Sequence, residues 1–258
     1  MRYKFFSSNS SSLGPYLKVL QNRNFLFLWI GQAVSMLGDS IFDIAVIWYV
    51  VELTGSAKAV GSVMVLSTVP YLILQIFGGV VVDRYDRKRI MLSSGILSCT
   101  TVLVFAALVL ADAAMIWHIY ILAAIFGTVG AFFIPAHAAL LPAIVDKSEL
   151  VTANSLRTTT SLMCGTLGPV IGGTLISLPF VGVGGVSIIN AVTFAAGATG
   201  ICFIRLLPEG KKGAVHESYT AALISGYKYL LTRREILFCT AVACLLNLVG
   251  VPIIVLMP

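Results

Sequence analysis

Seven long apolar runs constrain this chain more than any other feature of its sequence. A helix crosses the hydrocarbon core of a bilayer with about 20 apolar residues, and every one of these runs is long enough to do so. They lie at residues 25–51, 60–82, 90–110, 115–136, 155–178, 182–204 and 236–257. We therefore predict an all-α membrane protein, with a six-helix bundle followed by a seventh transmembrane helix.

The composition agrees with a chain that is solvated by lipid. Hydrophobic residues make up 58% of the sequence and charged residues 11%, whereas a soluble domain carries about 25% charged residues. The lysines and arginines lie between the apolar runs, where they set topology and contact anionic lipid, so no nucleic-acid partner is expected. All five cysteines lie within apolar runs, without metal-ligand spacing, so neither a metal nor a cofactor is predicted.

The positive charges predict the orientation of the chain. Sixteen of the seventeen lysines and arginines precede the first run or follow the second, fourth and sixth runs, and Lys58 alone lies on the opposite side. Because such residues are retained on the cytoplasmic side, we predict a cytoplasmic amino terminus. The chain is expected to be a multi-pass protein of the cell (inner or plasma) membrane.

Four segments follow from this topology. Residues 1–23 are expected to form a cytoplasmic tail, 24–205 the six-helix bundle, 206–235 a cytoplasmic linker, and 236–258 the seventh transmembrane helix. The linker places four apolar side chains on one helical face, which predicts a short amphipathic helix on the membrane surface; they are Leu223, Tyr227, Leu230 and Leu231. The chain ends directly after the seventh run without a polar flank, and we interpret it as truncated.

The first run carries a polar stripe. Its members are spaced three, four and four residues apart and so share one helical face; they are Gln32, Ser35, Asp39 and Asp43. A carboxylate at mid-membrane costs about 2.5–3.5 kcal/mol even on a lenient scale, and two acids one turn apart repel each other, so one is expected to hold a proton. The stripe predicts a cavity wall with a proton or cation site. The alternative places Asp43 near the outer interface and lets Asp39 bond a neighbouring helix.

The segment after the second run combines a glycine, two acids and a basic cluster. Its notable residues are Gly79, Asp83, Arg84, Asp86, Arg87, Lys88 and Arg89. This segment resembles the loop 2–3 motif of the major facilitator superfamily, G-x-x-x-D-[RK]-x-G-x-[RK]-[RK]. Asp86 stands where most members have glycine, as in a form that resembles a branch of drug and siderophore exporters.

Each part of this motif has an expected role. Gly79 is expected to let a neighbouring helix approach closely. Asp83 can receive a helix amino terminus or an arginine from the other half of a transporter. The basic residues are expected to stay cytoplasmic and to contact carboxylates or lipid.

The fifth run contains a glycine-rich stretch with a proline. Gly168, Pro169, Gly172 and Gly173 resemble the superfamily's antiporter motif, although Cys164 stands where another glycine is usual. Such a stretch predicts a kinked, closely packing surface, which in exporters controls closure of the cytoplasmic side. Glycine-rich faces also occur in membrane helices without antiport.

Two further segments resemble the exporter branch. The fourth run matches its helix, but Ala123 stands where many proton-coupled members carry arginine. Residues 133–142 resemble a loop that leads to the next helix, with Asp146 and Glu149 as its capping box. His137 within this segment is expected at a membrane interface.

The start of the fifth helix carries two polar residues that resemble the branch's pattern. Asn154 and Arg157 are interpreted as a cytoplasmic gate, with a snorkelling interfacial arginine as the alternative reading of Arg157. Four aromatic residues are candidates for substrate contact or for packing: Trp29, Phe42, Trp48 and Phe126.

The resemblance implies a secondary active transporter rather than an enzyme, similar to the macrolide-efflux and enterobactin-exporter branch. Such a protein would export small amphipathic molecules of the drug, macrolide or siderophore type, driven by protons, through alternating access between two six-helix halves. The expected partners are a small-molecule substrate, protons, the lipid bilayer, and a missing carboxyl-terminal half or a second chain.

Other classes fit less well. A seven-helix receptor normally has an outside amino terminus, and a retinal pigment needs a lysine that the seventh run lacks. An ATP-driven pump needs a phosphate-binding loop that ends in Gly-Lys-Ser/Thr, and His216-Glu217 lacks the second histidine of a metalloprotease motif. The remaining alternative is a truncated half-transporter or fragment with no transport activity by itself.

Overall fold

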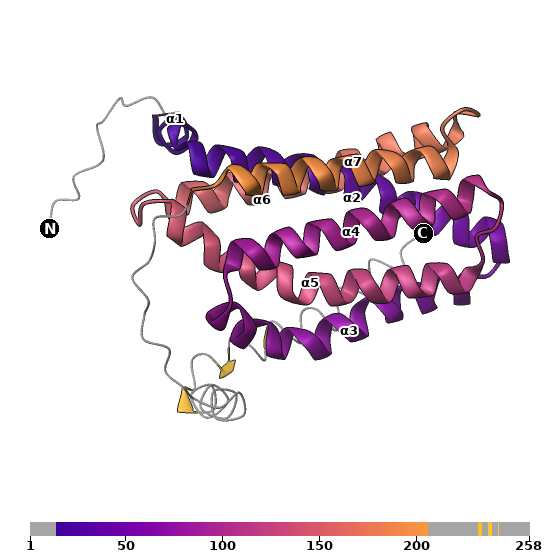
Figure 1. The fold of residues 1–258 in the computed structure, drawn as a ribbon, viewed down its shortest axis with the longest axis horizontal. Coiled ribbons are helices and arrows are strands. Elements are labelled where there is room, and N and C mark those ends of the chain that lie inside the picture. The colour runs from indigo at the N-terminus through magenta and orange to yellow at the C-terminus, as the bar shows by residue number, and fades with distance from the viewer. Residues whose placement is uncertain (1–13, 206–231, 234–236, 239–241, 243–258) are drawn as a thin grey trace, which may run out of the picture. The chain divides into compact units, whose positions relative to one another are not determined.

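The computed structural model describes residues 14–205 and residues 232, 233, 237, 238 and 242 (Figure 1). The chain divides into two compact units, Met1–Gly210 and Lys211–Pro258, and all the helices discussed below belong to the first. The predicted linker helix lies outside the described residues, as does nearly all of the seventh run.

Seven helices follow one another in the first unit. They are α1 (Gly14–Gln21), α2 (Arg23–Thr54), α3 (Ala57–Arg84), α4 (Arg87–Leu110), α5 (Ile116–Ile144), α6 (Leu150–Ser177) and α7 (Gly182–Phe203). The six helices from α2 to α7 are long and apolar enough to cross a membrane, and they coincide with the first six predicted runs. The described part of the chain contains no strand, so the prediction of an all-α membrane protein is confirmed. Helix α1 lies within the segment that was expected to be a plain tail.

Polar side chains cap the first turns of two of the helices, α2 and α4. The side chain of Asn22 accepts hydrogen bonds from the backbone N–H groups of Asn24 and Phe25, which caps the start of α2. Gly55 ends the same helix with φ of 60°, a conformation that glycine adopts without strain. Asp86 accepts a bond of 3.1 Å from the backbone N–H of Arg89 and so caps α4.

Two expectations at the α5–α6 connection are wrong. The segment 133–142 is helical, because α5 continues through two prolines to Ile144; Leu140 and Leu141 in this extension are buried in the core, and neighbouring helices make prolines tolerable in membrane helices. The predicted capping box does not form either. Glu149 is itself the N-cap of α6 without a side-chain cap bond, and its carboxylate instead pairs with Lys18 of α1 at 2.8 Å, which raises the pKa of Lys18.

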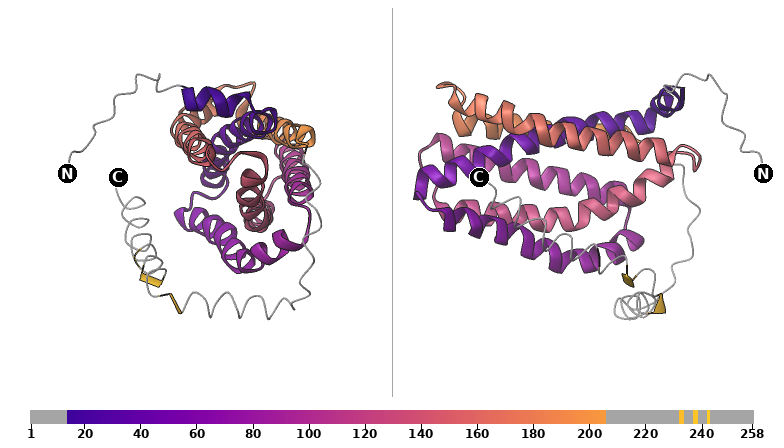
Figure 2. Two further views of the ribbon diagram at one scale, coloured as in Figure 1. Left: turned by 90° about the vertical axis from the view of Figure 1, so that its left-hand side faces the viewer. Right: turned by 180° about the vertical axis from the view of Figure 1, so that it is seen from behind.

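The six long helices form one bundle (Figure 2). Helix α2 packs against α6 and α7, α4 packs against α5 and α7, and α3 packs mainly against α5. Figure 1 accordingly shows α2, α6 and α7 as one group above α3, α4 and α5. Helices α3 and α6 are the least covered, with 11% and 17% of their central stretches buried, against 39% for α2. Both therefore present broad apolar faces outside the bundle.

Glycines set the closest helix contacts, but Gly79 is not among them. A Cβ added to Gly79 would meet no described atom within 4 Å, whereas one added to Gly78 would collide with the carbonyl oxygen of Ala131 on α5. Among the described residues, the close contact expected of Gly79 is made instead by its neighbour Gly78. The close approach of α3 to α5 depends on Gly78 and on its counterpart Gly127, whose added Cβ would collide with the backbone of α3.

The glycine-rich stretch of α6 is divided in the same way. Gly168 packs against Ser40 of α2, and Gly172 packs against Ile41. Gly173 is exposed, with no described atom within 4 Å of an added Cβ. Pro169 lies inside the helix. Two glycines of the predicted motif thus form the α2–α6 contact, whereas Pro169 is half-buried and Gly173 is exposed.

The apolar core consists of two clusters. One includes Phe25, Met91, Leu140 and Ile201 and lies toward the turn between α3 and α4, which we call the motif end. The other includes Phe42, Val102, Ile119 and Val186 and lies toward the opposite end. Four buried polar residues of α2 and α4 lie at the level between the two clusters, namely Gln32, Ser35, Ser94 and Ser98, while His137 lies beside the first cluster and Asn190 beside the second.

Candidate functional site

A cavity of about 330 Å³ lies at this polar level, between the two core clusters. Its polar lining comes from α2, α4, α5 and α6 and comprises Gln32, Ser35, Asp39, Ser94, Ser98, His137 and Arg157. A cavity of this size, mostly apolar with a few convergent polar groups, is typical of small-molecule sites. The structure therefore places three of the four residues of the predicted stripe in the wall of one cavity.

Asp39 is linked to α7 by a chain of polar contacts. The side-chain amide of Asn190 donates to the Asp39 carboxylate at 3.4 Å, and its carbonyl oxygen accepts from the Thr193 hydroxyl at 3.0 Å. Gly38 allows this arrangement, because an added Cβ would collide with both Asn190 and Thr193. The Asp39 carboxylate thus lines a cavity and also bonds a neighbouring helix.

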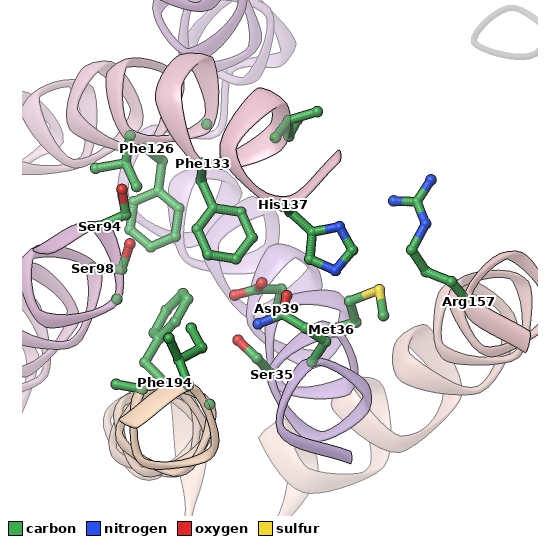
Figure 3. Close-up of a pocket in the computed structure, with 18 residues that line it drawn as sticks. Ser35, Met36, Asp39, Ser94, Ser98, Phe126, Phe133, His137, Arg157 and Phe194 are labelled. Atoms are coloured by element: carbon green, nitrogen blue, oxygen red, sulfur yellow. The ribbon is translucent and has the colours of Figure 1, made fainter. Parts of the chain in front are cut away.

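Aromatic rings form the apolar walls of the cavity. Phe126 and Phe133 project from α5 and Phe194 from α7, around the space that Asp39 and Ser35 enter from α2 (Figure 3). The rings of Phe126 and Phe194 lie 5.8 Å apart between centroids. Such walls suit the apolar part of a bulky ligand, while the carboxylate and hydroxyl groups provide hydrogen-bonding positions.

His137 lies inside the cavity, so the expectation of an interfacial position is wrong. It is 7% exposed, and its ring stacks on that of Phe133, with 6.3 Å between centroids. The side chain of Arg157 reaches the same side of the cavity from α6 (Figure 3). One wall therefore carries the imidazole and the guanidinium, and α2 carries the carboxylate.

Asp43 belongs to a different pocket. This second pocket, of about 270 Å³, lies among α2, α3 and α5, with Asp43 as its carboxylate and Ala123 in its wall. Of these two pockets, Asp39 lines the first and not the second. The predicted stripe is thus continuous along α2, but its last residue, Asp43, lines the second pocket.

The two residues of the predicted gate do not act together in this structure. Arg157 lines the first cavity, whereas the side chain of Asn154 donates to the Leu150 carbonyl of its own helix at 3.0 Å. The amide of Asn154 is thus bonded within α6, while Arg157 alone of the two lines the first cavity.

The loop motif binds helix ends. The Lys88 ammonium donates to the carbonyl oxygens of Cys202 and Ile204 at 2.8 Å each, where the unpaired carbonyls at the end of α7 attract a cation. Arg87 donates to the Ala139 carbonyl of α5 at 3.3 Å. Asp83 is exposed, and so are Arg84 and Arg89.

Several cavity residues were missed by the sequence reasoning. Asn190 interrupts an apolar run, and a lone amide in a membrane helix was a usable signal; Ser94, Ser98, Phe133 and Phe194 resemble ordinary helix residues. Of the aromatic candidates, Phe126 alone lines the first cavity. Trp29 bonds Thr160 of α6 at 3.0 Å, and Trp48 is 59% exposed. The described residues include no group of three or more metal-ligating side chains.

The comparison with known proteins agrees with this architecture. A family model described as Major Facilitator Superfamily matches residues 28–258. Macrolide efflux protein A of Streptococcus pyogenes is 32% identical over 126 residues, which cover 49% of this chain and 31% of that protein. The multidrug efflux pump Tap of Mycolicibacterium fortuitum is 27% identical over 203 residues, covering 75% and 48%. The enterobactin exporter EntS of Shigella boydii is 26% identical over 214 residues, covering 80% and 49%.

The alignments thus span a third to a half of the length of these curated relatives. The family model, however, covers most of the present chain, and the six described membrane-crossing helices fit its transporter class. The chain is therefore a multi-pass membrane protein that belongs to the major facilitator superfamily, a family of transporters.

Proposed function

We propose that this chain forms the amino-terminal helix bundle of a proton-coupled exporter of small amphipathic molecules. The observation that carries the proposal is the position of Asp39, whose carboxylate enters a cavity within the membrane-crossing part of the bundle. Ionisable residues inside membrane segments mark ion and substrate paths, because lipid gives them no solvation. Asp39 is thus the proposed proton carrier.

The walls of the cavity support the proposed class of substrate. Three phenylalanine rings offer an apolar surface, and Ser94, Ser98 and Asp39 offer polar groups between them. The relatives are named for macrolide efflux, multidrug efflux and enterobactin export, and a mixed lining of this kind suits molecules that combine apolar and polar parts. Transport in the outward direction is proposed from these names together with the cavity chemistry.

A second helix bundle, from a longer protein or from another chain, is part of the proposal. Helices α3 and α6 expose apolar faces, and the relatives are two to three times as long as the matched segments. Alternating access in this class rocks one bundle against another around a shared site. The alternative is a fragment without transport activity by itself. The exposed apolar faces of α3 and α6 and the greater length of the relatives favour this alternative as well.

The proposed orientation places the motif end in the cytoplasm. The basic cluster at Arg84 to Arg89 lies at that end, together with Lys18 and Arg205, and Lys58 lies at the other. This distribution follows the positive-inside rule.

Dye efflux in inverted membrane vesicles tests the function. Asp39→Asn should abolish efflux driven by a pH gradient while leaving membrane insertion intact, because the amide keeps the shape but carries no exchangeable acid proton. Asp112→Asn is the matched control, since Asp112 lies in the turn after α4, and it should transport normally. Undiminished efflux in Asp39→Asn would remove this residue from the mechanism. Efflux by the 258-residue chain reconstituted alone would contradict the fragment alternative.

A further inference from the structure

A row of four phenylalanines crosses the bundle at the border between the two pockets. Phe194, Phe126, Phe42 and Phe105 come from α7, α5, α2 and α4, and successive ring centroids lie 5.8, 6.2 and 6.0 Å apart. Phe42 and Phe105 are buried, with 2% and 3% exposure. The row is therefore a continuous apolar layer through four helices.

The two pockets meet at this layer. Phe126 lines both of them. The first cavity extends from Phe126 toward the motif end, where His137 and Arg157 lie. The second extends toward the opposite end, along the last turns of α2 and the first turns of α3 and α5.

Each pocket has its own carboxylate on the same helix. Asp39 and Asp43 are four residues apart, about 6 Å along the axis of α2, with Asp39 in the first cavity and Asp43 in the second. Among the described residues, Asp43 alone contributes a titratable side chain to the second pocket, whereas Asp39 shares the first with His137 and Arg157. Asp43 is exposed at the surface of the described bundle, in a pocket whose other polar side chain is Ser67. A carboxylate within the membrane-crossing length of α2 needs access to water or to a cation.

We infer that the phenylalanine row is a barrier between two compartments that open to opposite sides of the membrane, and that Asp43 is a second proton-carrying residue that serves the compartment at the opposite end. When the Phe126 ring moves aside, a proton leaves the Asp43 carboxyl group and joins the Asp39 carboxylate, so the total charge of the pair is unchanged. Water on the opposite side then protonates Asp43 again. The proton step rests on the proposed function, while the barrier does not.

Thiol labelling tests the barrier without requiring transport. In a chain whose five cysteines are replaced by alanine, Met36→Cys reports on the first cavity and Ile47→Cys on the second, both from α2. A membrane-impermeant cationic methanethiosulfonate is added to right-side-out or inverted vesicles. We expect Met36→Cys to react only from the side of the motif end, and Ile47→Cys only from the other side.

Adding Phe126→Ala should allow Met36→Cys to react from both sides, because the shared wall is then open. Phe133→Ala is the matched control, since Phe133 lines only the first cavity, and it should keep the reaction one-sided. Phe126→Leu, which retains apolar bulk, should also keep it one-sided and shows that the bundle tolerates substitution there. Two-sided reaction before Phe126 is changed, or one-sided reaction in Phe126→Ala, would overturn the barrier.

The proposed role of Asp43 is tested separately, by proton uptake. In vesicles, Asp43→Asn should lose proton uptake driven by a pH gradient while Met36→Cys keeps its one-sided labelling. Normal proton uptake in Asp43→Asn, together with its loss in Asp39→Asn, would refute the relay and leave the proposed function standing. Normal uptake in both variants would instead refute the proposed function.

Discussion

Gly168 offers a quantitative test of the helix packing, with Gly173 on the same helix as its control. A methyl group added at Gly168 would collide with the Cβ of Ser40 and lie 3.0 and 3.2 Å from that residue's carbonyl carbon and Cα. Rotation of the serine side chain relieves none of these contacts, because the backbone fixes the position of the Cβ as well as that of the other two atoms. Helices α2 and α6 must therefore separate.

The expected change in the free energy of unfolding follows from two opposing effects. Replacing glycine by alanine within a helix gains about 1 kcal/mol, and overpacking of a close contact costs about 1–3 kcal/mol. Gly173→Ala gains the helix propensity of alanine without the cost of overpacking, because its added Cβ meets no described atom within 4 Å. The difference in stability between the two variants is therefore about 1–3 kcal/mol, with the helix propensity cancelled. For a domain of this size that corresponds to about 2–12 °C in Tm.

Thermal unfolding in detergent, followed by the fluorescence of the three tryptophans, measures this difference. We expect Gly168→Ala to unfold at a lower temperature than Gly173→Ala. Equal unfolding temperatures would show that α6 does not approach α2 at Gly168 as closely as the structure has it. The antiporter-like stretch would then need another explanation for its glycines.

Two further predictions concern the motif end. Lys88→Met removes two charge-assisted bonds to the end of α7 and should lower the free energy of unfolding by about 1–3 kcal/mol. The control Arg89→Met changes an exposed side chain and should alter the free energy of unfolding little. Equal effects of the two substitutions would contradict the capping role of Lys88. Asp86→Ala should cost about 1 kcal/mol through the lost cap of α4, and Asp86→Gly only a few tenths. Denaturant titration in micelles measures both, and a larger loss for glycine than for alanine would argue against the cap.

Much of the fold was predictable, because lipid imposes a simple rule on the chain. Segments of about 20 apolar residues must be helical to satisfy their backbone groups, so six helices were predicted near their observed positions. Helix ends were less predictable. Helix α5 extends to Ile144 through a segment whose resemblance to the exporter branch suggested a loop, and Leu140 and Leu141 of this extension are buried in the core.

The candidate site was predictable only where a polar residue interrupts an apolar run. Asp39 and Gln32 were found in this way, and Asn190 carried the same signal. Phe133 and Phe194 gave none, because an aromatic residue in a membrane helix has the same sequence appearance whether it faces lipid, a neighbouring helix or a cavity. His137 was misplaced for a related reason, since its distance from the end of the apolar run suggested an interface.

By itself, the sequence determined that the chain is a bundle of membrane helices, where those helices lie along it, and that α2 carries acids on one face. These properties follow from hydropathy and from the helical period, which act within a single segment. Only the tertiary structure decided that Asp39 and Asp43 line separate pockets, that Gly78 rather than Gly79 meets α5, and that Lys88 binds the end of α7. Such choices depend on the rotation of each helix about its axis and on its neighbours, and a shift of one residue turns a side chain by about 100° around the helix.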